Sequence, residues 1–185
     1  TPLYSSAASD VYKRQAVVHF INDIGEDNIF EGDVYVTNDP WKGTGHLHDI
    51  TIVSPSFHKG RLIGYFASTA HVVDIGGRGF GPDAREVYEE GLFIPIMKLF
   101  ERGKVNRDLI NILRNNVREN DRVVGDFYAL SACNETGHKR LLDMLEEFQL
   151  DDLEHIGSFI LEHSRRATLE LSLIHISEPT RQAEI

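Results

Sequence analysis

The segment Gly32–Gly77 reads GDVYVTNDPWKGTGHLHDITIVSPSFHKGRLIGYFASTAHVVDIGG, and the rest of the chain can be interpreted around it. Two runs rich in apolar, β-branched and aromatic residues, Ile50–Val53 and Leu62–Ala70, predict antiparallel strands. The turn between them is expected within Ser54–Gly60. The second run is apolar on both faces, which favours a central strand. We therefore predict a β-hairpin whose open end carries polar residues from both strands.

Histidines and carboxylates gather at that open end. If the turn lies on His58–Lys59, the pairing register places His46 directly opposite His71, where Cβ atoms are about 4.5–5.5 Å apart. Two imidazoles at that spacing can share one metal ion. In the same register Asp49 lies opposite Ser68 and would point to the other face of a regular strand. The chain near His46 must therefore leave the ladder if Asp49 is to join the two histidines.

These residue types suit a divalent metal. Imidazole and carboxylate ligands without a thiolate favour manganese, iron, cobalt or zinc, and three protein ligands leave positions open for water or substrate. His48 is as attractive a ligand as His46 on the sequence alone. Asp74 is a candidate for orienting His71 or passing a proton, and Glu90 is a candidate general acid or base. The alternative interpretation of each residue is an ordinary solvated side chain.

Composition narrows the class of protein. The 185 residues are 41% hydrophobic and 26% charged, which is ordinary for a globular domain. The net charge of −10 disfavours nucleic acid or an anionic membrane as partner. No apolar run approaches the roughly 18 residues that a membrane span needs. The single cysteine, Cys133, excludes an internal disulfide framework and favours a reducing, cytoplasmic setting.

Helical patterns dominate the second half of the chain. Apolar residues at helical spacing predict a helix at Ala16–Ile24, and further helices are expected after the candidate caps Asn106, Asp121 and Asp151. The predicted class is α+β, with an antiparallel hairpin or sheet core first and helices later, as a fragment of a larger domain.

The two ends call for a separate interpretation. Residues 1–15 and 172–185 do not continue the neighbouring patterns and look like translated sequencing-adapter read-through, so we interpret both as non-native. The natural part is then expected to be residues 16–171, a partial domain of a longer protein.

Several sequence blocks, in this order, resemble the hydantoinase B family: GDVYVTNDPWKGTGHLHDITIVSP, STAHVVDIGG, GPDAREVYEEGLFIPIMKLF and NVRENDRVVGDFYALSACNETGHKRL. The family includes the B-type chain of N-methylhydantoinase, the C-terminal part of ATP-dependent 5-oxoprolinase and the alpha chain of acetone carboxylase. The resemblance covers about residues 16–148. It implies the catalytic part of an ATP-dependent hydrolase that opens a small cyclic amide, hydantoin or 5-oxoproline. ATP would be bound by a partner, the hydantoinase A-type subunit or domain, and not by this chain.

The resemblance also implies a ligand set. In the acetone carboxylase branch the metal is manganese, held by an HxxD pair and a later histidine, and these match His46, Asp49 and His71. A divalent metal is thus expected, manganese before zinc or iron. Two alternatives stay open: a fragment of an acetone-carboxylase-like alpha chain, and a non-catalytic scaffold segment for the A-type partner. Many members carry AHH where this chain has AHVVDIGG, which leaves the substrate open.

Overall fold

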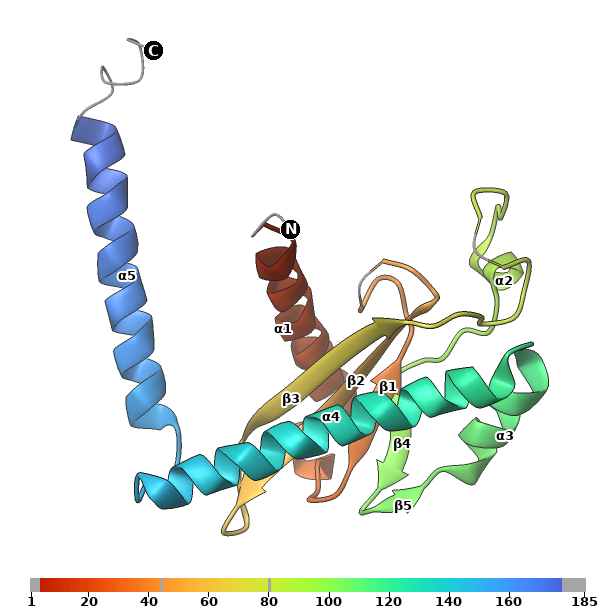
Figure 1. Ribbon diagram of the computed structural model, residues 1–185, viewed down its shortest axis with the longest axis horizontal. Helices are drawn as coiled ribbons and strands as arrows, with labels where there is room; N and C mark the ends of the chain where they lie inside the picture. Colours follow the sequence, from red (N-terminus) through yellow and green to blue (C-terminus); the bar gives the residue numbers. More distant parts are fainter. Residues whose placement is uncertain (1–3, 44, 80, 178–185) are drawn as a thin grey trace. The chain divides into compact units, whose positions relative to one another are not determined.

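The structure, a computed structural model, describes residues 4–43, 45–79 and 81–177 (Figure 1). Within that part of the chain one antiparallel sheet has the strand order β3-β2-β1-β4-β5. Its strands are β1 (Val34–Thr37), β2 (Asp49–His58), β3 (Arg61–His71), β4 (Met97–Glu101) and β5 (Lys104–Val105). All five strands lie before Asn106 and helices make up most of the described chain after it, so the predicted α+β class is confirmed.

Helices precede the first strand, interrupt the strands once and follow the last strand along the sequence. They are α1 (Tyr4–Ile24), the 3-10 helix η1 (Glu26–Asn28), α2 (Val87–Glu90), α3 (Arg107–Asn116), α4 (Asn120–Glu147) and α5 (Glu154–Ser177). The predicted cap of α3 is confirmed, because the side chain of Asn106 accepts a hydrogen bond from the Leu109 backbone N–H at 3.1 Å.

The described residues divide into two compact units, one ending at Met144 and the other beginning at Leu145. The second unit contains α5. Just before this helix the side chain of Asp152 accepts a hydrogen bond from the Glu154 N–H at 3.0 Å. The cap predicted at Asp151 stays a prediction. No helix in the described residues is long and apolar enough to cross a membrane.

Helices of the first unit cover both faces of the sheet (Figure 1). Successive side chains of a strand point to opposite faces, so neighbouring residues of β1 enter different cores. Tyr35 packs with Phe20 of α1, their ring centroids 6.2 Å apart. Val36 joins the other cluster, which contains Leu113 of α3 and Phe127 of α4.

Strand β3 lies at an edge of the described sheet, so the prediction that it is central was wrong. Its apolar residues are explained by the helices on both faces. Tyr65 belongs to the cluster around α1. On the other face Phe66 abuts Gly137 of α4, where an added Cβ would lie 2.7 Å from the ring. Apolar residues on both faces of a strand therefore indicate two covering layers, and do not indicate a place in the middle of the sheet.

The hairpin of β2 and β3 is longer than predicted, and its turn lies one residue later. Lys59 and Gly60 form the turn with φ angles of 51° and 77°, and His58 pairs with Arg61. Positive φ at both central residues is the geometry that two-residue hairpins prefer, and glycine accommodates it without strain. The register then shifts at a bulge, because Ser56 pairs with Gly64 while Phe57 pairs with Leu62.

Asp33 is a buried carboxylate at the start of β1. It pairs with the Lys98 ammonium at 2.9 Å and accepts hydrogen bonds from the Tyr35 hydroxyl at 2.8 Å and the Arg102 N–H at 2.9 Å. Burial alone would raise the pKa of Asp33, but the bonds from Lys98, Arg102 and Tyr35 together lower it below its usual 3.8. Asp33 therefore joins β1 to the β4–β5 turn as a charged group.

The lowered pKa of Asp33 predicts a pH-dependent contribution to stability. A group whose pKa falls on folding stabilises the fold above its unfolded pKa, and this contribution is lost as pH falls through the folded pKa. We expect Asp33→Asn to destabilise by about 3 kcal/mol at pH 7, because Lys98 loses its buried partner. The gap between wild type and variant should close below pH 3.8 in urea unfolding curves. A gap that stayed constant from pH 7 to pH 2 would contradict this account.

Candidate metal centre and adjoining cleft

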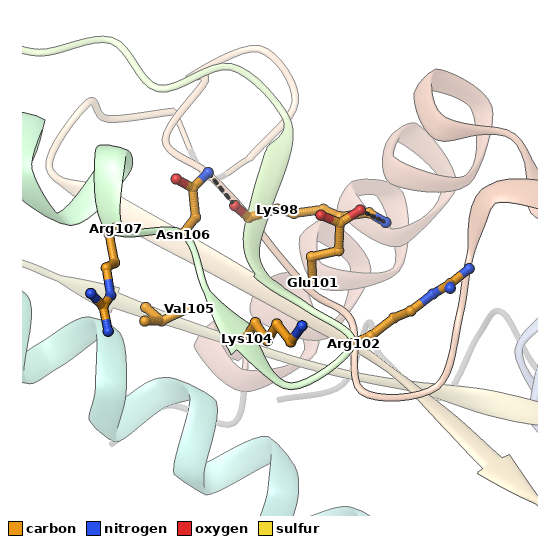
Figure 2. Close-up of a pocket in the computed structure, with 7 residues that line it drawn as sticks. All are labelled: Lys98, Glu101, Arg102, Lys104, Val105, Asn106 and Arg107. Atoms are coloured by element: carbon orange, nitrogen blue, oxygen red, sulfur yellow. Dashed lines mark hydrogen bonds and ion pairs between the residues drawn. The ribbon is translucent and has the colours of Figure 1, made fainter.

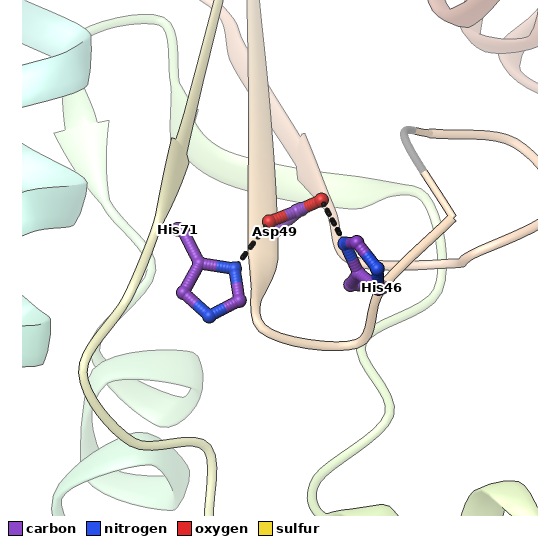
Figure 3. Close-up of side chains that lie close together, drawn as sticks. All are labelled: His46, Asp49 and His71. Carbon is purple, nitrogen blue, oxygen red and sulfur yellow. Dashed lines mark hydrogen bonds and ion pairs between the residues drawn. The ribbon is translucent and has the colours of Figure 1, made fainter. Parts of the chain in front are cut away.

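His46, Asp49 and His71 form a cluster at the open end of the hairpin, as predicted (Figure 3). The Asp49 carboxylate lies between the two rings. One oxygen is 2.7 Å from Nδ1 of His71, and the other is 3.1 Å from Nδ1 of His46. Each residue offers one ligand atom, and these atoms lie within 4.8 Å of one another. The predicted trio is therefore brought together, with Asp49 at its centre.

The register that brings the trio together differs from the predicted one. Asp49 is directly opposite His71, so both side chains point to the same face of the sheet. The predicted pairing of His46 with His71 was wrong by three residues along β2. The later turn accounts for two of these residues and the bulge for the third. No departure of Asp49 from the ladder is needed, because it is the first residue of β2.

His46 reaches the carboxylate from a turn that precedes β2. The Asp49 N–H donates to the His46 carbonyl at 3.1 Å, which closes a four-residue turn. Asn38 fixes the turn from outside, since its side-chain amide donates to the Leu47 carbonyl at 2.8 Å. The same amide donates to the Leu92 carbonyl at 2.8 Å, two residues after Glu90. Asn38 thus ties the histidine turn to the segment that carries Glu90.

The cluster is partly exposed, so an ion bound there would also contact solvent. The side chains of His46 and His71 are 58% and 45% exposed, whereas that of Asp49 is 12% exposed. Two imidazoles and one carboxylate fit a divalent ion of the manganese, iron or zinc type, and three protein ligands leave room for a further one. The donor set therefore fits the expected metal.

Glu90 lies at the C-terminus of α2 and lines a cleft of about 380 Å³ together with His46 and His48. Backbone packing holds this segment. A Cβ at Gly77 would lie 2.5 Å from the Glu90 carbonyl carbon, and the Leu92 N–H donates to the Ile75 carbonyl at 2.8 Å. Only glycine permits that approach. The loop after β3 therefore places Glu90 beside the histidine turn.

Asp74 has a different environment from Glu90. It is buried, and its carboxylate accepts hydrogen bonds from the backbone N–H and, at 2.7 Å, from the guanidinium of Arg118. Burial would raise the pKa of Asp74, but the bonds from Arg118 and from the Gly76 backbone lower it overall. Asp74 is therefore ionised at neutral pH and joins the loop after β3 to the start of α4. Its predicted role in proton transfer stays a prediction.

His48 was as attractive a ligand as His46 on the sequence alone, but the ligand set implied by the family resemblance left it out. It is 4% exposed, and its ring stacks on that of His71, with centroids 5.3 Å apart and planes 14° apart. Burial, and then the neighbouring His71, lower the pKa of His48. The sequence signal for this placement was the position of His48 next to Leu47 in a turn, because adjacent residues in a turn point their side chains in different directions.

A larger hollow of about 550 Å³ lies at the β4–β5 turn and the start of α3 (Figure 2). Its basic lining residues are Lys98, Arg102, Lys104 and Arg107. Lys98 pairs with Asp33 at 2.9 Å and Glu101 at 3.4 Å, and the Arg102 guanidinium lies 4.1 Å from the centre of the Phe30 ring. Two of the cations are thus engaged by neighbours, and none of the predicted site residues lines this hollow.

The layered sheet and the His–Asp–His cluster define an α+β protein with a candidate metal centre at a strand end. The chain belongs to the Hydantoinase B/oxoprolinase family, whose sequence profile matches residues 11–181. The resemblance stated from the sequence blocks is therefore confirmed.

Two curated relatives are similar over most of this chain. One is the beta chain of the caprolactamase of Pseudomonas jessenii, 37% identical over 130 residues, which are 69% of this chain and 22% of that protein. The other is the B-type chain of a putative D-/L-hydantoinase of Pseudomonas sp. (strain NS671), 32% identical over 170 residues, or 90% of this chain and 28% of that protein. The chain thus spans about a quarter of the length of these relatives.

Solved structures share the fold. The ATP-dependent caprolactamase from Pseudomonas jessenii matches with a TM-score of 0.68 and 34% identity, over 74% of this chain and 24% of that one. A nucleotide-free acetone carboxylase matches with a TM-score of 0.64 and 23% identity, over 71% of this chain and 18% of that one. At that identity the likeness to acetone carboxylase shows the fold alone.

Proposed function

We propose that this chain is part of the B-type component of an ATP-dependent hydrolase that opens a small cyclic amide, a lactam or hydantoin ring, together with an ATP-binding A-type partner. Relatives named as the beta chain of a caprolactamase and the B-type chain of a hydantoinase support the reaction class and the partner. The single observation that carries the proposal is the His46–Asp49–His71 cluster beside a cleft that contains Glu90.

The proposed role of each residue follows from its position. His46, Asp49 and His71 would hold the divalent ion, with manganese proposed before zinc or iron. Such an ion polarises a carbonyl group and lowers the pKa of water, which is the chemistry that amide hydrolysis needs. Glu90, at the wall of the cleft, is proposed to carry the proton. Asp74 is the weaker candidate for that role, because it is buried and both of its carboxylate oxygens accept hydrogen bonds from Arg118.

The test uses the full-length protein that contains residues 16–171, since we keep the interpretation that 1–15 and 172–185 are non-native. It is co-expressed with the proposed A-type partner. We expect ring opening of caprolactam, hydantoin or 5-oxoproline that depends on ATP and yields ADP in step with product. We also expect about one divalent ion per B-type chain, measured by elemental analysis, because the cluster offers one set of ligands.

A His46→Ala, His71→Ala double variant separates this proposal from a scaffold role. Loss of both metal and ring opening, with the A-type partner still co-purifying, is the expected result. Unchanged metal content and unchanged activity would refute the metal centre. An assembled complex that turned over none of the three rings, and hydrolysed no ATP in their presence, would favour the scaffold segment.

A further inference from the structure

His48 occupies a backbone position that is fixed from two sides. It lies in the turn closed by the Asp49 N–H and the His46 carbonyl at 3.1 Å. Its own carbonyl accepts a hydrogen bond from the N–H of Val72 at 2.8 Å, the residue that follows β3. His48 is therefore anchored both to the strand that begins at Asp49 and to the segment that follows His71.

The ring of His48 stacks on the ring of His71 and restricts its orientation. The two planes are nearly parallel, 14° apart with centroids at 5.3 Å, so His48 covers a face of His71. His46 meets the same ring edge-on, at 6.1 Å and 85°. Asp49 holds Nδ1 of His71 at 2.7 Å, and this hydrogen bond fixes the position of that nitrogen more than the tilt of the ring plane. A flat neighbour stacked against the face of the ring restricts that tilt.

The same side chain connects the cluster with the cleft. His48 lines the cleft with His46 and Glu90, while its ring contacts His71. Its 4% exposure contrasts with the 58% and 45% of the His46 and His71 side chains. A buried ring stacked on a solvent-exposed one can orient it, whereas the two exposed rings are accessible to an ion and a substrate.

We propose that His48 is a positioning residue of the metal centre: by stacking on His71 it fixes the plane in which that imidazole offers its nitrogen to the ion. This inference rests on the proposed function, because it requires a metal at His46, Asp49 and His71. It assigns the effect to the flat ring of His48 and not to a ring nitrogen. A phenylalanine at position 48 should therefore preserve the positioning of His71, and an aliphatic side chain should not.

The test compares His48→Phe with His48→Leu in the full-length protein. Both fill the buried space, and they differ in the flat ring. Calorimetric titration of the metal-free protein with Co²⁺ should give His48→Phe an affinity within about threefold of wild type and His48→Leu an affinity about tenfold weaker, the range that an aromatic pair contributes. The Co²⁺ visible spectrum should shift in the leucine variant alone, since it reports ligand geometry.

A matched control is His163→Leu, because His163 stacks on Phe159 in α5 with centroids 5.9 Å apart. It should leave Co²⁺ binding unchanged. Equal weakening by phenylalanine and leucine at position 48 would overturn the inference in favour of a role for a ring nitrogen, and no weakening by either would overturn it outright. A wild-type protein that binds no Co²⁺ would instead overturn the proposed metal centre itself.

Discussion

Replacing Asp49 with alanine is expected to lower the affinity of the centre for Mn²⁺ by more than about 100-fold, beyond the effect of losing an outer hydrogen-bonding partner. Asp49 is the only anionic member of the cluster, and its two oxygens contact the rings of both histidines. Its removal therefore deletes a ligand and releases His46 and His71 together. Titration of the metal-free full-length protein with Mn²⁺ measures the loss, and ring opening should disappear with it.

The control for this variant is Asp27→Ala, which removes an exposed carboxylate from η1. It should leave Mn²⁺ binding at the wild-type value. Asp49→Asn provides a second comparison, because the amide keeps the size of the side chain but not its charge. An Asp49→Ala protein that still bound Mn²⁺ within tenfold of wild type would show that the ion, if bound, lies elsewhere.

Replacing Asn38 with alanine is expected to cost at least about 3 kcal/mol of unfolding free energy, because several buried backbone groups lose their partner at about 1–3 kcal/mol each. The Asn38 amide donates to the carbonyls of Leu47 and Leu92, and its Oδ1 accepts from the Ile94 N–H at 2.6 Å. Asn38 is 1% exposed, so water does not replace these bonds. Urea unfolding of the full-length protein measures the change.

The matched control is Asn115→Ala, since Asn115 lies on the exposed side of α3 and bonds the Asn111 carbonyl at 2.7 Å. Its removal should change stability by less than about 0.5 kcal/mol. A loss below about 1 kcal/mol for Asn38→Ala, the low end for an unsatisfied buried group, would mean that the histidine turn and the Glu90 segment hold their places without this link. Metal affinity should fall with stability, because Leu47 is part of the turn that presents His46.

The sequence predicted those elements whose signals are local. The Asn106 cap and the strand runs of the hairpin depend on residues near one another in the chain, and the structure contains them. The apolar residues of β3 suggested a central strand, but β3 lies at an edge of the sheet. Those residues reflect the layers that cover its two faces, and not its place in the strand order. Helices α1 and α4 supply the two covering layers, one on each face, and no pattern within β3 predicts them.

The candidate site likewise has features that the sequence predicted and features that it did not. The three cluster residues could be chosen from residue type and family pattern, and the structure brings them together. Their pairing could not, because register depends on where the turn falls and on a bulge. The glycine of Lys59–Gly60 was the available clue to the turn. The clue to the bulge near Ile63 was Gly64, because an isolated glycine inside a strand often marks a bulge. The stacking of His48 on His71 could not be predicted, because it requires the turn geometry.

The bulge has a consequence for how this hairpin can change length during evolution. Ile63 gives β3 one residue more than β2 between the turn and the His46–Asp49–His71 cluster. Loss of that residue would straighten the ladder and leave Asp49 opposite His71. Loss of one residue from β2 would instead move His48 into the place opposite His71. Lineages that keep the His46–Asp49–His71 cluster should therefore tolerate single-residue gaps beside Ile63 and exclude them from β2, so that gap positions in an alignment identify the chains that keep this cluster together.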